Sequence, residues 1–462
     1  MNFLFLLLPL IYLPSLFNFF SSDDWFLMRI SQIGSFQQFL NFFSFNQTAE
    51  SAAFYRPIPQ QLFLFIFQKL FGLNPLPYHL FVLFCFGLVL YLLNLLAKKL
   101  DFTKTQTAIT LMVYGVASAN FPQVYFLSAF QDILLPLFVL LSLILFLNKK
   151  FSLSLVFFVL SLMSKETAVI MPLLLVLICW FKKKQFFKLV IPYALIALVY
   201  LFLRLIVFGN TQGDSYIWDF SPYKAGNTFM WYSLWTIGTP EILVDYVGSG
   251  FKILPKLFTD MPTWSRVILI ELVSSILALS VFFVSVRRQL FSKSRFLIFS
   301  ILFFMISLIP VIFIPWHKFT HALSLPLLGF ALLIGYFGKD LKWALKTFLV
   351  VFIITNLSTQ VLLFSKHYSV TRGTIAKRVY EYMNNNYPVY PSGKYFYFVN
   401  NSDNQKTVWG ESKQVGISLS MSDFFKVYYH DNSIKVYYED LEESKPNKEQ
   451  MIFIPSQQFL ID

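Results

Sequence analysis

The chain has 462 residues, of which 56% are hydrophobic, 19% are aromatic and only 13% are charged. Soluble domains carry about 25% charged residues, so this composition excludes an ordinary soluble protein and predicts an integral membrane protein. The net charge of +13 does not indicate a nucleic acid partner, because the lysines and arginines fall mostly between hydrophobic runs and not on one basic face. The two cysteines lie within apolar stretches and predict buried thiols.

The length of the apolar runs predicts an all-α polytopic protein with about eleven transmembrane helices. The first run has no basic leader and no small-residue cleavage site, so we expect a retained helix and not a removed signal peptide. The predicted crossings are 2–20, 74–97, 105–120, 127–147, 151–163, 167–181, 187–208, 265–286, 295–315, 322–338 and 342–364.

Every second connection between these runs is short and basic. This alternation predicts on which side of the membrane each connection lies. Cytoplasmic loops carry an excess of lysine and arginine. The basic connections contain Lys98, Lys99, Lys104, Lys149, Lys150, Lys182, Lys183, Lys184, Lys188, Arg287, Arg288, Lys293, Arg295, Lys339, Lys342 and Lys346. We therefore expect a cytoplasmic N-terminus in the plasma or inner membrane, with loops 21–73 and 209–264 and the segment 365–462 outside.

Two adjacent acids, Asp23 and Asp24, follow the first crossing directly in a predicted polar loop. Carboxylates beside a bilayer are costly to desolvate, so their presence calls for a reason. One interpretation is a general base at the mouth of a membrane cavity; the other is that the pair only ends a helix at the water boundary.

The tripeptide 164–166 separates two runs, 151–163 and 167–181, that are too short to span a bilayer alone. A helical pair of this kind would place Lys165 and Glu166 below the outer surface, where ionisable residues are candidates for function. The alternative is that the two side chains pair with each other and only pin the hairpin.

The first outer loop contains Tyr55 and Arg56, followed by an amphipathic run, 58–71, that we expect to lie along the membrane interface. His79 stands near the start of the second crossing. We expect a structural hydrogen bond or helix cap from this histidine.

Further charged or titratable residues occur at positions after the first outer loop. The turn at 316–321 contains His317, Lys318 and His321, three potential cations. Arg204 either faces a cavity or extends to the interface. Asp132 begins the fourth crossing, where a helix N-terminus favours an acid regardless of function.

Residues 365–462 differ in composition from the rest and predict a small extracytoplasmic α/β domain, separate from the transmembrane domain 1–364. We expect helices at 369–385 and 419–429 and strands at 394–400, 433–439 and 450–455. No glycine-rich phosphate loop is found there.

Four motifs over roughly residues 1–340 occur in an order that resembles GT-C-type glycosyltransferases. The sequence looks like the protein O-mannosyltransferase branch, especially bacterial relatives of the transmembrane tetratricopeptide-repeat O-mannosyltransferases. The motifs are Asp23-Asp24, Tyr55-Arg56-Pro57-Ile58, Phe71-Gly72-Leu73-Asn74-Pro75 with Tyr78-His79-Leu80, and Ser164-Lys165-Glu166 with Pro172.

The chain also departs from that branch. A family His-Pro segment and a Ser-Gly-Arg-x-Asp segment are represented here by Asn120-Phe121-Pro122 and 128–132, where only Ser128 and Asp132 remain. The tetratricopeptide repeats are absent, so the identity of the acceptor does not carry over.

The resemblance implies transfer of a sugar, such as mannose, from a polyprenyl-phosphate donor to a hydroxyl of a protein, lipid or glycan on the outer face. In this hypothesis the base is Asp23 or Asp24, and Asp23 is preferred. Glu166 orients Lys165. No cofactor is required, although two carboxylates and a histidine could hold a divalent ion. The remaining assignments are donor-phosphate binding by Arg56, Lys165, Arg204, His317, Lys318 and His321, and support by Tyr55, His79 and Asp132.

Two other functions remain open from the sequence. A flippase or other transporter of lipid-linked glycans would also use short broken helices. A polysaccharide polymerase or ligase would transfer a glycan from a diphosphate-linked donor.

Overall fold

The computed structural model describes residues 3–51, 54–183, 187–209, 216–339, 343–401, 410–441 and 447–460. Lys184 and Lys342 of the basic connections lie outside these ranges. The described chain is predominantly helical, with one small sheet.

The first predicted crossing consists of two short segments, α1 (Leu4–Leu7) and a 3-10 helical stretch, Leu8–Phe17, which contains Pro14. Proline cannot donate a backbone hydrogen bond, which favours this departure from a regular α-helix. After it, Ser22 takes φ 48° and ψ −121°, and the chain turns into α2 (Asp23–Ile30). The acids predicted in a loop therefore form the first turn of a helix.

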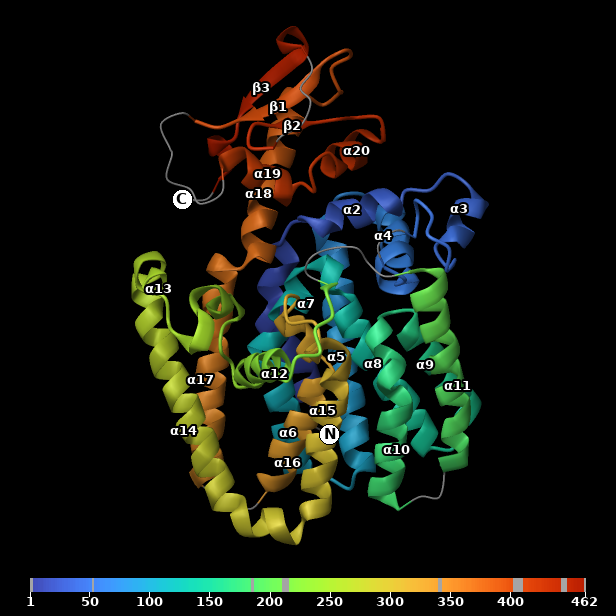
Figure 1. Cartoon of the computed structure of the whole chain (residues 1–462), viewed down its shortest axis with the longest axis vertical. Coiled ribbons are helices and arrows are strands. Elements are labelled where there is room, and N and C mark those ends of the chain that lie inside the picture. Colours follow the sequence, from blue (N-terminus) through green and yellow to red (C-terminus); the bar gives the residue numbers. More distant parts are fainter. Residues whose placement is uncertain are drawn as a thin grey trace.

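The chain then continues through α3 (Phe36–Asn41), a π-helical turn (Pro57–Leu62) and α4 (Phe63–Phe71), which confirms the predicted helical run at 58–71. The bundle below it comprises α5 (Pro75–Lys99), α6 (Lys104–Val116), α7 (Phe121–Tyr125), α8 (Gln131–Leu147), α9 (Phe151–Leu162), α10 (Met171–Lys182), α11 (Ile191–Phe202), α12 (Pro222–Thr236), α13 (Lys256–Asp260), α14 (Pro262–Ser292), α15 (Ser294–Ile312), α16 (Pro326–Phe337) and α17 (Trp343–Lys366) (Figure 1).

Six described helical stretches are long and apolar enough to cross a membrane, which supports a membrane-embedded helical protein. They are Pro75–Lys99, Leu127–Leu147, Lys188–Val207, Pro262–Ser292, Ser294–Ile312 and Trp343–Asn386. Shorter apolar helices occur at Leu4–Phe17, Phe151–Leu162 and Pro326–Phe337.

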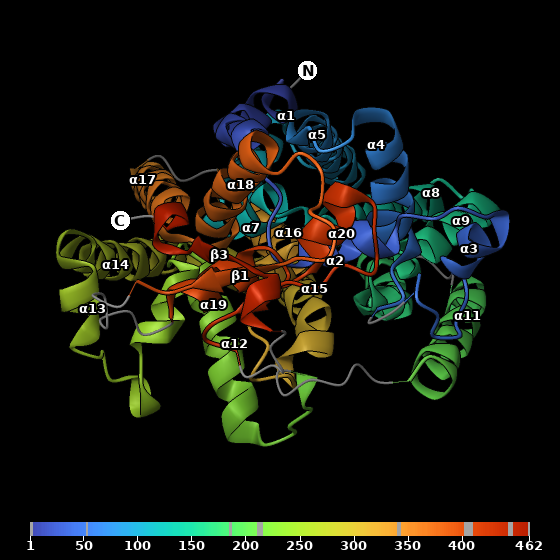
Figure 2. The ribbon, with the colours of Figure 1, turned by 90° about the horizontal axis from the view of Figure 1, so that it is seen from above.

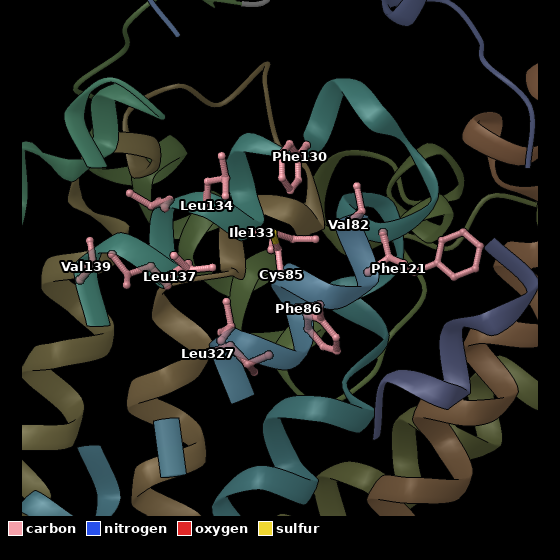
Figure 3. Packing of buried hydrophobic residues seen from close by; sticks show 14 of the residues in the cluster. Val82, Cys85, Phe86, Phe121, Phe130, Ile133, Leu134, Leu137, Val139 and Leu327 are labelled. Carbon is pink, nitrogen blue, oxygen red and sulfur yellow. The ribbon is translucent and has the colours of Figure 1, made fainter. Parts of the chain in front are cut away.

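The core of the bundle is formed by aliphatic and aromatic side chains from helices that are distant in sequence. Val82 and Phe86 of α5 are buried beside Ile133 of α8, and Cys85 is a buried free thiol among them (Figure 3). Packing of α5 against α8 holds the N-terminal end of α8, and with it Asp132, in place.

The C-terminal segment forms a compact unit on one end of the bundle, opposite the turn between α14 and α15 (Figure 1). Helix α18 (Tyr368–Asn386) leads into a fully parallel sheet in the order β2-β1-β3, with Tyr397 paired to Tyr437 and to Phe453. The strands are β1 (Tyr395–Val399), β2 (Tyr437–Tyr438) and β3 (Met451–Pro455), and α19 (Glu411–Ser418) and α20 (Asp423–Tyr429) connect β1 to β2.

Most of these C-terminal elements match the prediction, but α19 was not predicted and the strand expected over 433–439 has only two residues. The α20 helix also starts four residues later than the predicted 419. Ser420 and Met421 have positive φ values of 49° and 55°, which end α19 and separate the two helices.

The C-terminal unit rests on α2 (Figure 2). The Ser22 N–H donates to the Ser418 carbonyl over 2.8 Å, and the Arg29 and Asp423 side chains form an ion pair at 2.7 Å. The rings of Trp25 and Phe424 meet edge to face, with their centroids 4.9 Å apart. These contacts join the unit to the segment that carries Asp23.

Candidate functional site

A cavity of about 700 Å³ lies where α2, the loop after α9, the C-terminal end of α11, the loop after α15 and the start of α18 meet. This volume is within the range of small-molecule sites. Seven residues that the sequence singled out line it: Asp23, Arg56, Lys165, Glu166, Arg204, His317 and His321.

Asp23 begins α2, and the turn at Ser22 directs it to the cavity. Its carboxylate forms no hydrogen bond or ion pair with another residue in the part of the chain that the structure describes. The Asp23 side chain is exposed toward the cavity, yet desolvation by the surrounding protein raises the pKa of Asp23, while the charge of Arg372 opposes the rise. An unpartnered carboxylate with a raised pKa is chemically suited to accept a proton.

Asp24, in contrast, is buried and does not line the cavity. Its Oδ1 accepts hydrogen bonds from the Ser128 N–H (2.8 Å) and Oγ (2.6 Å), and its Oδ2 accepts one from the Ser21 N–H (2.9 Å). Burial raises the pKa of Asp24 to about 7. Asp24 therefore fixes the start of α2 against the loop before α8.

Arg56 and Glu166 form a bidentate pair, with Nε to Oε2 at 2.9 Å and Nη2 to Oε1 at 2.5 Å. Lys165 donates instead to Asp132 Oδ1 over 2.5 Å. Glu166 therefore does not orient Lys165, as was expected, and the two side chains do not pair with each other, as the alternative proposed. Burial opposes ionisation of Glu166, but Arg56 holds the pKa of Glu166 at about 2.

Asp132 is completely buried, and its second oxygen, Oδ2, has no hydrogen-bond partner among the described residues. Its role is therefore to hold Lys165, and not merely to begin a helix. Buried charges need such partners because desolvation is costly.

The turn after α15 is less cationic than the sequence suggested. Burial, with the charges of nearby groups, lowers the pKa of His317 to about 3, and burial also lowers the pKa of His321. Both imidazoles are thus neutral near pH 7 and offer hydrogen-bonding nitrogens in place of positive charge. Lys318 donates to Asn227 Oδ1 over 2.9 Å and does not line the cavity.

Of three further residues that the sequence singled out, one lines the cavity and two lie outside its lining. Arg204 lines the cavity and stacks on the ring of Phe208, 4.8 Å from its centroid. Tyr55 donates to the Phe43 carbonyl over 3.3 Å, and His79 contacts the Val124 carbonyl at 3.2 Å; neither of these two lines the cavity. The structural role expected for His79 is confirmed.

Trp218, a tryptophan of loop 209–264 that could stack on a sugar or belong to an aromatic belt, lines the cavity, and so do Tyr216, Tyr368 and Arg372, which the sequence did not single out. Tyr368 and Arg372 come from the first turns of α18, in the segment that the sequence separates from the membrane part. The exposed indole of Trp218 offers a flat surface of the kind on which sugars stack.

Among the described residues, no three His, Cys, Asp or Glu side chains gather as ligands of a metal ion would. No protein-family model matches the chain, and a comparison with curated proteins gave no significant match.

Proposed function

We propose that this protein is a membrane glycosyltransferase that moves a sugar from a polyprenyl-phosphate donor to a hydroxyl acceptor. The observation that carries the proposal is the shared cavity, in which the unpartnered carboxylate of Asp23 faces the same space as Arg56 and Lys165. Such a cavity joins a base to fixed positive charge, as a displacement that expels a phosphate requires.

In the proposed reaction the acceptor O–H gives its proton to Asp23 while its oxygen forms a bond to the anomeric carbon. The bond between that carbon and the phosphate oxygen breaks, and the electron pair leaves with the polyprenyl phosphate. One displacement from the opposite face inverts the anomeric centre and forms no covalent enzyme intermediate. Arg56, Lys165 and Arg204 stabilise the charge on the leaving phosphate, and the neutral imidazoles of His317 and His321 add hydrogen bonds.

Two pairs of charges keep the cations in place for this reaction. Glu166 fixes the guanidinium of Arg56, which retains further N–H donors, and Asp132 fixes Lys165, which has two further N–H bonds. Preorganised donors of this kind need no rearrangement when charge develops on the phosphate.

The proposal includes eleven crossings, a cytoplasmic N-terminus and an extracytoplasmic segment 365–462 in a plasma or inner membrane. The cavity then opens toward the outer face, where the lipid-linked donor would deliver its sugar. Mannose is the sugar suggested by the resemblance, and a protein, lipid or glycan would supply the hydroxyl.

The proposal is tested with purified protein in lipid vesicles, a radiolabelled polyprenyl-phosphate sugar and a panel of hydroxyl acceptors. We expect label to appear covalently on an acceptor, and Asp23→Asn to reduce the rate by about 10²- to 10⁴-fold, the usual contribution of a general base. Glu381→Gln makes the same acid-to-amide change on the exposed surface of α18 and should leave the rate unchanged. Movement of the lipid across the vesicle without bond formation would contradict the proposal and favour a flippase.

A further inference from the structure

The two central cations of the cavity are already neutralised by the protein itself. Arg56 is paired with Glu166 and Lys165 with Asp132, each at 2.5 Å. An anion that enters the cavity therefore meets two charge-balanced pairs, and Asp23 adds a negative charge. Binding an anion favourably at this site calls for cations beyond these two pairs, and both Arg204 and Arg372 line the cavity.

Arg372 supplies a cation of this kind from the second turn of α18. It lines the cavity, and its Nη1 donates to Ser22 Oγ over 3.3 Å, beside Asp23. Its guanidinium lies 5.1 Å from the centroid of the Tyr368 ring. Arg372 forms no ion pair with a carboxylate in the described ranges, although its charge influences Asp23.

The backbone around Arg372 fixes it in this position. A Cβ atom at Gly373 would lie 2.8 Å from the Phe19 carbonyl oxygen, so only glycine allows α18 to approach the chain so closely. The Asn18 side chain donates to the carbonyls of Ser369 and Tyr125, which ties the start of α18 to the segment before Asp23. Arg372 and Asp23 are thus held together on one wall of the cavity.

We propose that Arg372 binds the anionic group of the substrate, a phosphate ester, in the cavity that Asp23 also lines. The C-terminal unit then completes the site by placing a guanidinium in it, and does not serve only as a cover. An arginine is suited to this role, because its planar fork presents several donors to phosphate oxygens. The identity of the phosphate as that of a lipid-linked donor rests on the proposed function, but anion binding can be measured without any sugar transfer.

The experiment measures binding of a polyprenyl monophosphate and of the uncharged polyprenol to the full chain in nanodiscs. We expect the wild-type protein to prefer the phosphate, and Arg372→Gln to weaken phosphate binding by roughly 10- to 100-fold without weakening polyprenol binding, as loss of a charge-assisted hydrogen bond does. Arg372→Lys should bind with intermediate affinity. Lys377→Gln removes the same charge from the exposed face of α18 and should bind like the wild type.

A second arm uses inorganic phosphate alone to identify the source of the anion. If inorganic phosphate competes with polyprenyl phosphate for the wild-type protein, and Arg372→Gln abolishes this competition, the site accepts any phosphate. If only polyprenyl phosphate binds, the site recognises a lipid headgroup. Wild-type phosphate preference in Arg372→Gln would overturn the inference, and so would equal loss of polyprenol and phosphate binding. If Arg372→Gln does not fold, unchanged affinity in Arg372→Lys would overturn it. Failure of sugar transfer with intact phosphate binding would contradict only the proposed function.

Discussion

At the scale of single residues, the pair Asp23 and Asp24 shows how neighbouring identical side chains acquire different chemistry. Asp24 accepts three hydrogen bonds within the fold, whereas Asp23 faces the cavity without such partners. Carboxylates that accept hydrogen bonds are fixed in place, but a general base must be free to receive a proton. The geometry therefore favours Asp23 as the base and Asp24 as the residue that positions it.

The pH dependence of transfer tests this assignment. Asp23 acts as a base only when ionised, and desolvation raises its pKa, so we expect the rate to fall with decreasing pH at values above the usual aspartate pKa of about 4. Arg372→Gln removes a charge that lowers the pKa of Asp23, so the acid limb of kcat/KM should move to still higher pH. Arg372→Lys keeps the charge and should leave the limb close to that of the wild type. An unshifted limb in Arg372→Gln would mean that Asp23 is not the titrating base.

The buried pair Lys165 and Asp132 gives a prediction about stability. Removal of one partner leaves the other charge buried and unpaired, so Lys165→Ala and Asp132→Ala should each lower the free energy of unfolding by about 3–5 kcal/mol. The double variant should lose much less than the sum of the two. Denaturation of the purified protein in detergent measures this cycle. Additive losses would show that the pair does not act as a unit.

At the scale of elements, α2 and α18 form the wall that holds the proposed chemistry. The N–H of Ser22 donates a hydrogen bond to the carbonyl of Ser418, and Arg29 forms an ion pair with Asp423. The C-terminal unit therefore contacts α2 at both of its ends. Ser22 has a positive φ of 48°, a conformation that costs energy unless its surroundings impose it. The contacts of the C-terminal unit with α2 hold Ser22 in this conformation.

A substitution at Gly373 tests the close approach of α18. The added methyl group of Gly373→Ala would collide with the Phe19 carbonyl oxygen, so α18 must shift, and Arg372 with it. We expect a lower melting temperature and a reduced rate of transfer. Gly226→Ala is the matched control, because a Cβ at Gly226 in α12 meets no atom within 4 Å. There the change should be neutral or stabilising by about 0.5–1 kcal/mol, through helix propensity. Equal behaviour of the two variants would contradict the proposed constraint.

At the scale of the whole molecule, the C-terminal unit and the turn between α14 and α15 lie at opposite ends of the bundle (Figure 1). That turn contains Lys293 and is flanked by Arg287, Arg288 and Arg295. The positive-inside rule predicts that such a turn is cytoplasmic, and the cavity end of the bundle would then face outward.

Cysteine labelling in intact cells tests this orientation. The native Cys85 and Cys179 are buried and can be replaced by alanine, after which single cysteines are introduced at the exposed positions of Lys377 and Lys150. A membrane-impermeant maleimide should label Lys377→Cys in intact cells and Lys150→Cys only after the membrane is permeabilised. The reverse pattern would invert the topology and remove the cavity from the outer face.

The sequence alone determined the class of the protein and the place of most helices. Long apolar runs separated by polar turns are local properties, because each run must satisfy its own backbone hydrogen bonds in lipid. For this reason the predicted runs at 74–97 and 342–364 agree closely with α5 and α17. The proline-containing first run and the two-residue strand β2 agree less well, because their geometry depends on neighbours.

Only the tertiary structure decided which charged residues meet. The sequence singled out Asp23, Arg56 and Lys165, and the fold brings all three to one cavity, but the pairing of Arg56 with Glu166 could not be read from residues that are 110 positions apart. The contribution of Arg372 from the C-terminal unit was likewise beyond prediction. Ion pairs and desolvation depend on distances between segments remote in the chain, whereas the hydrophobicity of a run does not.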